Sequence, residues 1–503
     1  MQYQSTGGAI NKISSAEAIV SGLSGDGGLF VPGSFPQITL ETIIELSKKS
    51  YAARAAYIMS LYLSDFTQEE LTTYSNSAYS VKKGTSGFTD HIAPLYGLND
   101  NTHFLELWHG PTCAFKDMAL QVMPLLLTAS LKKINEKRKV CILVATSGDT
   151  GKAALEGFKD IENTKIMVFY PENGVSEVQK IQMTTQKGNN VNVVSVEGNF
   201  DDSQTGVKEI FKDKAFIKEL DNNGVFLSSA NSINWGRLVP QIVYYISAYC
   251  DLITGRKIKP GEKINFCVPT GNFGNILAAY YAEKMGLPVN KLICASNRND
   301  VLTQFINTGV YDKNRPFYTT VSPSMDILVS SNLERLLYEL SEKDGNTVTS
   351  YMKSLSENGN YKITPKTGDE LNRIFSSGYC TEEETMQTIK NTYKNDNYLI
   401  DTHTAVAYKV LNDYKKSTGD KTVSVVVSTA SPFKFCGAVI NALDESTGVT
   451  INDDITMIEK LSDMTGCNIP DPLKGLKNEK QRFTETVSIN KMKDSVKRFI
   501  QEG

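Results

Sequence analysis

The stretch VCILVATSGDTGKAALEGF, residues 140–158, places a strand, a loop and a helix in immediate succession. Its apolar run over residues 140–146 predicts a buried strand. Small and N-capping residues follow over residues 147–151, and the amphipathic stretch after them predicts a helix. Parallel sheets covered by helices are built from such units. The stretch therefore predicts an α/β fold.

Further apolar runs predict more buried strands, with helical stretches between them. They lie at residues 165–170, 191–198, 264–270, 291–296 and 422–429. Because the runs form two clusters, we expect two open sheet domains with helices on both faces. We divide the chain into an N-terminal segment (1–90), a small α/β domain (91–235) and a large α/β domain (236–503) with a helical insertion near 330–397. The Gly- and Pro-rich stretch at residues 25–38 predicts turns at the surface.

Composition limits the classes of function. The 503 residues are 40% hydrophobic and 22% charged, which is typical of a soluble globular protein. A net charge of -3 argues against nucleic-acid binding by bulk charge. We find no membrane span and no secretory signal. Eight scattered cysteines without a CxxC pair suggest the reducing cytoplasm, and four histidines without close metal-ligand spacing predict no metal site.

Lys116 is an unusual cation in the stretch HGPTCAFKDMALQ, residues 109–121. It follows a Gly-Pro turn and lies between Phe115 and Asp117. A solvated surface lysine is the ordinary interpretation. A catalytic amine is the alternative, and an apolar pocket would lower its pKa as that task requires. Phe115, Trp108 and Cys113 are the expected pocket residues, and Asp117 is expected to point away, toward the helix N-terminus.

Three strand ends carry polar groups. The first junction, residues 147–151, leaves backbone N–H groups for an anion at a helix start, although a plain cap by Ser147 or Asp149 also accounts for it. The second junction, residues 271–275, has the outline of a phosphate cradle but is neither a Walker loop nor a GxGxxG fingerprint, and a Gly-rich turn without a ligand stays open. Thr429 ends the run at 422–429 with a hydroxyl, which is equally suited to capping the next element.

A lysine, a phosphate cradle and a hydroxyl are together what pyridoxal phosphate needs. The lysine forms a Schiff base with its aldehyde, the cradle holds its phosphate, and the hydroxyl meets its ring nitrogen. The sequence therefore predicts a pyridoxal-phosphate enzyme. A non-catalytic α/β protein that binds nucleotides or anions is the alternative from another class.

At this point the chain resembles a known family. The stretches SGLSGDGGLFVP, ELWHGPTCAFKDMALQ, ATSGDTGKAAL, SSANSINWGR, PTGNFGNILAAYYA, IDTHTAVAY and VVSTASPFKF resemble, in order, those of the threonine synthase family of fold-type II pyridoxal-phosphate enzymes. They run from about residue 22 to about residue 435. The resemblance implies conversion of O-phospho-L-homoserine and water to L-threonine and phosphate, the last step of threonine biosynthesis, by a carbon–oxygen lyase. A monomer or dimer acting on a small molecule is expected.

The resemblance also assigns residues. It implies that Lys116 carries the cofactor, removes the Cα proton and makes most later proton transfers. It places Thr429 at the pyridine nitrogen and the substrate α-carboxylate at the first junction, with Ser147 and Thr150 as side-chain donors. For the substrate phosphate, Arg237 is the cation of choice because its planar fork matches phosphate oxygens, and a structural salt bridge is its alternative. The remaining assigned residues are Gly271, Asn272, Phe273, Gly274 and Asn275 for the cofactor phosphate, and Asn231 and Asn234 for the substrate.

The chain departs from the family pattern at two positions. Gly7 lies where relatives often have an arginine, and Ser431 lies where they often have a histidine. His109 is a further candidate for the pocket wall, and His403 is expected to fix a loop. The nearest rival function is another reaction on the same fold, such as a serine or threonine dehydratase or a β-replacement enzyme.

Overall fold

The opening stretch folds as predicted. The computed structural model describes residues 1–9, 11–81, 87–89, 91–172, 175–444 and 454–501. Strand β5 (Lys139–Ala145) runs into helix α7 (Asp149–Phe158). Alternate residues of β5 face opposite sides: Ile142 packs in the core that contains α7, and Leu143 packs in the core that contains α9 (Phe200–Lys212). Helices therefore cover both faces of this sheet, as the apolar run predicts.

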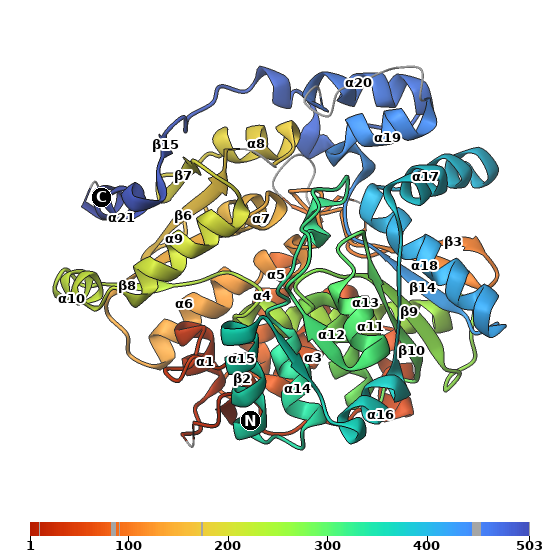
Figure 1. Ribbon diagram of the computed structural model, residues 1–503, viewed down its shortest axis with the longest axis horizontal. Helices are drawn as coiled ribbons and strands as arrows, with labels where there is room; N and C mark the ends of the chain where they lie inside the picture. The colour runs from red at the N-terminus through yellow and green to blue at the C-terminus, as the bar shows by residue number, and fades with distance from the viewer. Residues whose placement is uncertain (10, 82–86, 90, 173–174, 445–453, 502–503) are drawn as a thin grey trace.

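The smaller sheet has five strands in the order β15-β7-β6-β5-β8, and every pair in it is parallel. The edge strand β15 comes from the C-terminal part of the chain. The C-terminal helix α21, which follows it, lies against α9 (Figure 1). The remaining elements of this part are β6 (Thr164–Pro171), β7 (Val191–Val196), β8 (Val225–Ser228), β15 (Thr486–Val487), α5 (Asp117–Leu120), α6 (Met123–Lys133), α8 (Glu177–Thr184), α10 (Lys214–Asn222) and α21 (Met492–Gln501).

The larger sheet has six strands in the order β13-β10-β9-β14-β4-β3, and only the β3–β4 pair is antiparallel. On one face it packs against α18, and on the other it shares a core with α11 and α12. Its strands are β3 (Leu95–Asn99), β4 (Thr102–Glu106), β9 (Ile264–Pro269), β10 (Val289–Ser296), β13 (Phe375–Tyr379) and β14 (Ser424–Ser428). Its helices include α11 (Trp235–Thr254), α12 (Gly274–Lys284), α13 (Val301–Thr308), α18 (Thr402–Thr418), α19 (Cys436–Leu443) and α20 (Asp454–Thr465).

All six predicted strands are present, and the predicted α/β class with two open sheets is confirmed. Strand pairing crosses the predicted domain limits, because β3 and β4 join the larger sheet and β15 joins the smaller one. Residue 90, the last of the predicted N-terminal segment, lies outside the described residues. The segment near 330–397 is mostly helical: α14 (Leu333–Leu340), α15 (Gly345–Asn358), β12 (Asn360–Lys362), α16 (Pro365–Ile374), β13 and α17 (Glu382–Asp396).

The N-terminal segment packs around α11, which is buried along almost its whole length. Its Gly- and Pro-rich stretch differs from the prediction, because Leu29 and Phe30 are buried rather than at the surface. The reason is that β2 pairs with β1 and the buried Arg335 donates to the Phe30 carbonyl at 2.9 Å. The elements here are β1 (Tyr3–Ser5), α1 (Ser15–Ser21), β2 (Phe30–Pro32), α2 (Leu40–Ser47), α3 (Tyr51–Tyr62) and α4 (Gln68–Ala78).

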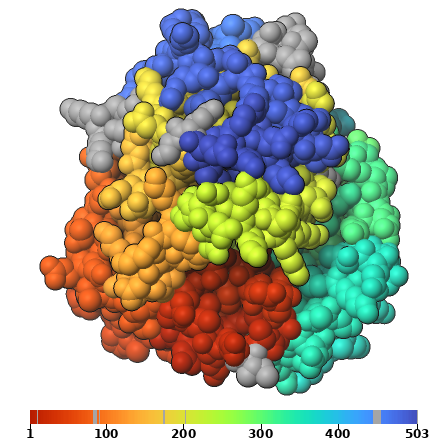
Figure 2. Space-filling view, turned by 90° about the vertical axis from the view of Figure 1, so that its left-hand side faces the viewer, coloured from red at the N-terminus to blue at the C-terminus, as the bar shows by residue number. Residues whose placement is uncertain are grey.

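Figure 2 shows the N-terminal residues in red below the yellow-green α9–α10 region, which the dark blue C-terminal residues border from above. The ion pair between Lys493 and Asp213, at 2.8 Å, joins these last two regions. Among the helices in the described ranges, we find none with the length and apolar character needed to span a membrane.

Candidate active site

Lys116 ends a loop that is fastened to the end of β14. The Phe115 N–H donates to the Thr429 carbonyl at 2.8 Å, and the Ser431 N–H donates to the Cys113 carbonyl at 3.1 Å. Cys113 has a left-handed φ of 57°, which marks the tight turn before this contact. The backbone thus brings the predicted cofactor lysine beside Thr429, the residue predicted to face the ring nitrogen.

The side chain of Lys116 is buried, and only 8% of the residue is exposed. Its Nζ lies 4.5 Å from the centroid of the Phe115 ring and 3.4 Å from Oδ2 of Asp149. Burial lowers the pKa of Lys116, Asp149 opposes this effect, and the charges of Lys434 and Arg237 add to it. The predicted lowering of the lysine pKa is therefore confirmed. A buried amine of this kind is suited to nucleophilic and proton-transfer roles.

The neighbours of Lys116 have partners of their own. Trp108 donates from Nε1 to Oγ of Ser428 at 3.1 Å and stacks on the His109 ring. Asp117 accepts hydrogen bonds from the N–H and the hydroxyl of Thr112, at 2.8 and 2.7 Å. It points away from Lys116 as predicted, although toward Thr112 rather than toward the helix N-terminus. Burial raises the pKa of Asp117 to about 7.

In the first junction, a threonine hydroxyl accepts hydrogen bonds from two of the backbone N–H groups. Oγ1 of Thr146 accepts from the N–H groups of Gly148 and Gly151, both at 2.9 Å. The N–H groups of residues 147, 149 and 150 have no acceptor in the part of the chain that the structure describes. The side chains of Ser147 and Thr150 are half-buried. Donors thus remain available for an anion at the start of α7.

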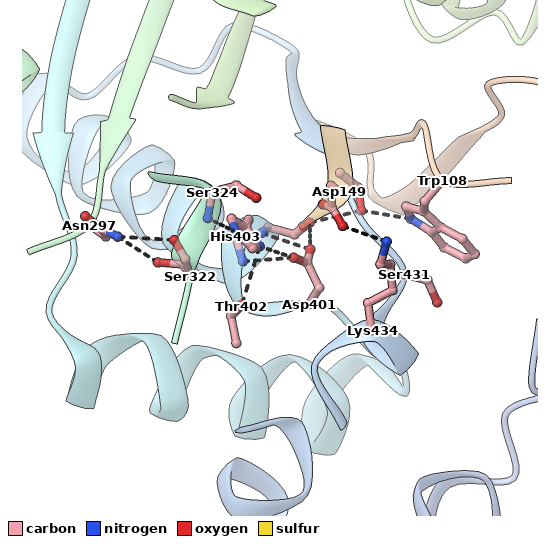
Figure 3. Close-up of polar contacts among 12 residues, drawn as sticks. Trp108, Asp149, Asn297, Ser322, Ser324, Asp401, Thr402, His403, Ser431 and Lys434 are labelled. Carbon is pink, nitrogen blue, oxygen red and sulfur yellow. Dashed lines mark hydrogen bonds and ion pairs between the residues drawn. The ribbon is translucent and has the colours of Figure 1, made fainter. Parts of the chain in front are cut away.

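Asp149 is buried in this junction and is held by two residues that the sequence prediction missed. Its Oδ1 lies 2.6 Å from Nζ of Lys434 (Figure 3). The same oxygen accepts from Nε2 of Gln179 at 2.8 Å. Although burial opposes ionisation, the charges of Lys434 and Lys116 hold the pKa of Asp149 well below its usual range. The signal that singled out Lys116, a lysine beside aromatic residues, also marks Lys434 in the stretch SPFKF.

The second junction exposes backbone donors without bringing in a charged side chain. Phe273 adopts a left-handed φ of 62°, and α12 begins at Gly274. Within the described residues, the N–H groups of residues 274–276 have no acceptor. The shape of the loop is fixed from its other side, where Oγ of Ser330 donates to the Gly271 carbonyl at 2.8 Å and the Asn332 N–H donates to the Asn272 carbonyl at 3.1 Å. This geometry is that of an anion cradle.

The side chain of Asn275 is oriented by α11. Its Oδ1 accepts from the hydroxyl groups of Tyr244 and Tyr245, the latter at 2.6 Å. Its buried Nδ2 has no partner among the described residues. Because the oxygen is committed to the tyrosines, the amide nitrogen remains a donor that is free to contact a ligand.

A short turn, η1 (Pro323–Met325), covers the second junction. A Cβ atom added at Gly271 would lie 2.5 Å from the Ser324 carbonyl oxygen. The Ser324 N–H donates to Nε2 of His403 at 3.2 Å, and Asp401 holds Nδ1 of that histidine at 2.7 Å (Figure 3). The prediction that His403 fixes a loop is confirmed. Within the described ranges, His, Cys, Asp and Glu side chains form no group that would hold a metal ion.

Arg237 is a buried cation in the first turn of α11, with 3% of its surface exposed. One guanidinium nitrogen donates to the Ala230 carbonyl at 2.9 Å, while Nε has no partner among the described residues. Burial lowers the pKa of Arg237 to about 10, and no described carboxylate forms an ion pair with it. The alternative of a structural salt bridge is therefore not supported.

The two predicted asparagines differ. The amide of Asn234 donates to the carbonyls of Ile19 and Ser229, at 3.0 and 3.1 Å, and accepts from the Gly236 N–H at 2.8 Å. Asn234 thus caps α11 with an amide that is committed to the backbone, and its contact with the substrate stays a prediction. Asn231 is half-buried, and its Oδ1 has no partner among the described residues.

These residues fit pyridoxal phosphate. Lys116 provides a buried amine for the aldehyde, and the second junction provides uncommitted N–H groups for the phosphate. Thr429, only 5% exposed, provides a hydroxyl at the strand end beside Lys116. The unpartnered Nδ2 of Asn275 adds a donor to the cradle. Fold and site together define a pyridoxal-phosphate-dependent enzyme of fold type II.

Comparison with known families narrows this class. The family "Pyridoxal-phosphate dependent enzyme" matches residues 92–429, "Threonine synthase N terminus" matches residues 2–79, and "Threonine synthase, C-terminal" matches residues 404–500. The chain belongs to the threonine synthase family, and its cofactor is pyridoxal phosphate.

Individual relatives and solved structures to which the chain is similar are also threonine synthases or threonine synthase-like proteins. Threonine synthase from Saccharomyces cerevisiae is 36% identical over 98% of this chain and 97% of its own length. Human threonine synthase-like 1 is 43% identical over 85% of this chain, but the match spans only 58% of that relative's length. The crystal structure of pyridoxal-phosphate-bound threonine synthase from Brucella melitensis is 36% identical, covers 99% of both chains and has a TM-score of 0.86.

Proposed function

We propose that the chain converts O-phospho-L-homoserine and water to L-threonine and phosphate. The observation that carries this proposal is Arg237, a buried guanidinium without a described carboxylate partner, whose charge acts on Lys116. An uncompensated buried cation is unfavourable unless an anion binds it. Its planar fork matches the oxygens of a phosphate, which sets a phosphorylated amino acid apart from serine or threonine.

The remaining residues are given roles by the same logic. Ser147, Thr150 and the free N–H groups of the first junction bind the substrate α-carboxylate, and Asn231 contributes its unpartnered amide. Residues 271–275 bind the cofactor phosphate, and Thr429 contacts the ring nitrogen. Donors at two helix starts are suited to two separate anions.

Pyridoxal phosphate, when bound, supplies an electron sink conjugated with the substrate Cα. Lys116 removes the Cα proton and carries the protons exchanged at Cβ and Cγ. The Cγ–O bond breaks, and Arg237 stabilises the charge of the departing phosphate. Water then adds its oxygen to Cβ, and the atoms of O-phosphohomoserine and water are all accounted for in threonine and phosphate. The lowered pKa of Lys116 supports this role, because only the uncharged amine accepts a proton.

The test compares products from purified protein with added cofactor. Phosphate release from O-phosphohomoserine, with threonine formed in equal amount, is the expected result. Keto-acid formation from serine or threonine without phosphate release would instead favour a dehydratase. Arg237→Met is expected to lower kcat/KM for the phosphorylated substrate by ~100-fold, because it removes charged hydrogen bonds. Arg237→Lys keeps the positive charge but lacks the planar fork, so its kcat/KM should lie between those of the wild type and Arg237→Met.

We also propose a cytoplasmic location, a monomer or dimer, and no nucleic-acid partner. All eight cysteines are free thiols, which is typical of a reducing compartment, and the net charge is -3. The division into residues 1–90, 91–235 and 236–503 remains our proposal for segments of the chain, and strand pairing joins these segments because β3 and β4 lie in the larger sheet and β15 in the smaller one.

A further inference from the structure

Lys434 is a fully buried lysine at the end of η2 (Pro432–Lys434), just after β14. Its Nζ lies 2.6 Å from Oδ1 of Asp149 and donates to the Thr112 carbonyl at 3.0 Å. It therefore connects the end of the larger sheet with α7 of the smaller sheet and with the loop before Lys116. A buried ammonium is retained only when such partners compensate it.

Asp149 lies between the ammonium groups of Lys434 and Lys116, and its contact with Lys434 is the shorter of the two. Its Oδ1 has the short contact with Lys434 and a second bond from Gln179 at 2.8 Å, whereas Oδ2 lies 3.4 Å from Lys116. Charge-assisted hydrogen bonds are typically ~2.7–2.9 Å long, so the contact with Lys116 is the weak one. Lys434 and Gln179 thus hold the carboxylate by the oxygen that does not face Lys116.

We propose that Lys434 is a positioning residue that keeps Asp149 from becoming the tight ion-pair partner of Lys116. It holds the carboxylate and shares its charge, and so leaves the Lys116 amine free to lose its proton. This inference rests on the proposed role of Lys116 as the reacting amine. It concerns the chain's own side chains and applies to the protein before substrate binds.

The charges facing Lys116 fix the sign of the expected effect. Asp149 on α7 favours the charged lysine, whereas Lys434 on η2 and Arg237 on α11 disfavour it. Asp117, the next residue in the chain, is committed to Thr112. Removing Lys434 takes away one cation and releases the carboxylate toward Lys116. Both changes raise the lysine pKa.

The experiment measures the pKa of Lys116 in the full-length protein without cofactor. Acetylation by acetic anhydride is followed from pH 6 to 11 by mass spectrometry of the peptide that contains Lys116. Lys434→Met should move the inflection upward by about one pH unit or more, a tenfold loss of free amine below it. The control Lys409→Met removes a lysine that pairs with Glu384 and Asp413 away from the site, and should leave the inflection in place.

Two more variants keep the outcome decisive. Lys434→Gln retains a hydrogen-bond donor for Asp149, so it preserves the fold if the methionine variant does not, and it should shift the inflection in the same direction. Adding Asp149→Asn to Lys434→Met removes the released carboxylate and should return the inflection to the wild-type position or below. An unchanged inflection in folded Lys434→Met or Lys434→Gln overturns the proposal, as does a double variant that stays shifted. Acetylation needs no substrate, so failure of the proposed reaction is read separately, from phosphate release.

Discussion

The two strand–loop–helix junctions both present backbone donors at a helix start, but they are held in shape in different ways. The second junction, after β9, contains no ionisable residue, and its shape is set by a left-handed Phe273 and by hydrogen bonds to its carbonyls. The first junction, after β5, contains the buried Asp149, which an ion pair with Lys434 must hold. The difference teaches that one site depends on backbone shape and the other on charge balance.

Removing Lys116, which contacts Asp149 of the first junction, has the largest expected effect. Lys116→Ala should lower the rate of phosphate release by at least ~10⁴-fold, because it removes the amine that carries the proposed proton transfers. The second junction is intact in this variant, so pyridoxal phosphate should still bind non-covalently in equilibrium dialysis. Turnover within tenfold of the wild type would contradict the role of Lys116.

Charge balance in the first junction is tested by Asp149→Asn. The variant leaves Lys434 buried without a counter-ion, so the free energy of unfolding should fall by ~3–5 kcal/mol in urea titrations. Asp413→Asn, which removes a partner from the exposed pair with Lys409, is the matched control and should cost less than ~1 kcal/mol. Equal effects of the two substitutions would remove the distinction between the junctions.

For both junctions, the sequence predicted where a strand ends and a helix begins with free backbone N–H groups. Strand ends followed by small residues fixed the positions of both cradles, and Lys116 was found because apolar neighbours surround it. It did not predict Lys434 or Gln179 beside Asp149, since contacts between distant segments depend on how two sheets pack. For the same reason the sequence did not show that Asn234, assigned to the substrate through the family resemblance, caps α11. Strands β4 and β13 were missed because polar residues interrupt their apolar pattern.

Asp117 is a second buried carboxylate near Lys116, and unlike Asp149 its hydrogen-bond partner is Thr112 rather than a lysine. Its pKa is raised to about 7, so between about pH 4 and pH 7 the folded state keeps a proton that the unfolded state has released. This contribution to stability is present below about pH 4 and is lost as the pH rises through about 7, by up to ~4 kcal/mol. Asp117→Asn lacks the proton, so its free energy of unfolding should improve relative to the wild type over this range. Parallel pH profiles in urea titrations would contradict the assignment.

The shape of the second junction is tested by Gly271→Ala, for which we expect the smallest effect. The new methyl group would lie 2.5 Å from the Ser324 carbonyl, so the covering turn must move. The dissociation constant for pyridoxal phosphate should rise by about tenfold, ~1.4 kcal/mol, without a change in its pH dependence. Gly368→Ala is the control, since a methyl group there meets nothing within 4 Å. Cofactor affinity that is unchanged in Gly271→Ala would show that shape does not limit this junction.

The most direct test of the proposed reaction follows the oxygen of water. O-Phosphohomoserine is incubated in ¹⁸O-labelled water with the protein and pyridoxal phosphate, and both products are analysed by mass spectrometry. Cleavage of the Cγ–O bond with addition of water at Cβ predicts one label in the hydroxyl group of threonine and none in the released phosphate. Label in the phosphate, with homoserine as the second product, would show cleavage of the P–O bond and contradict the proposed function.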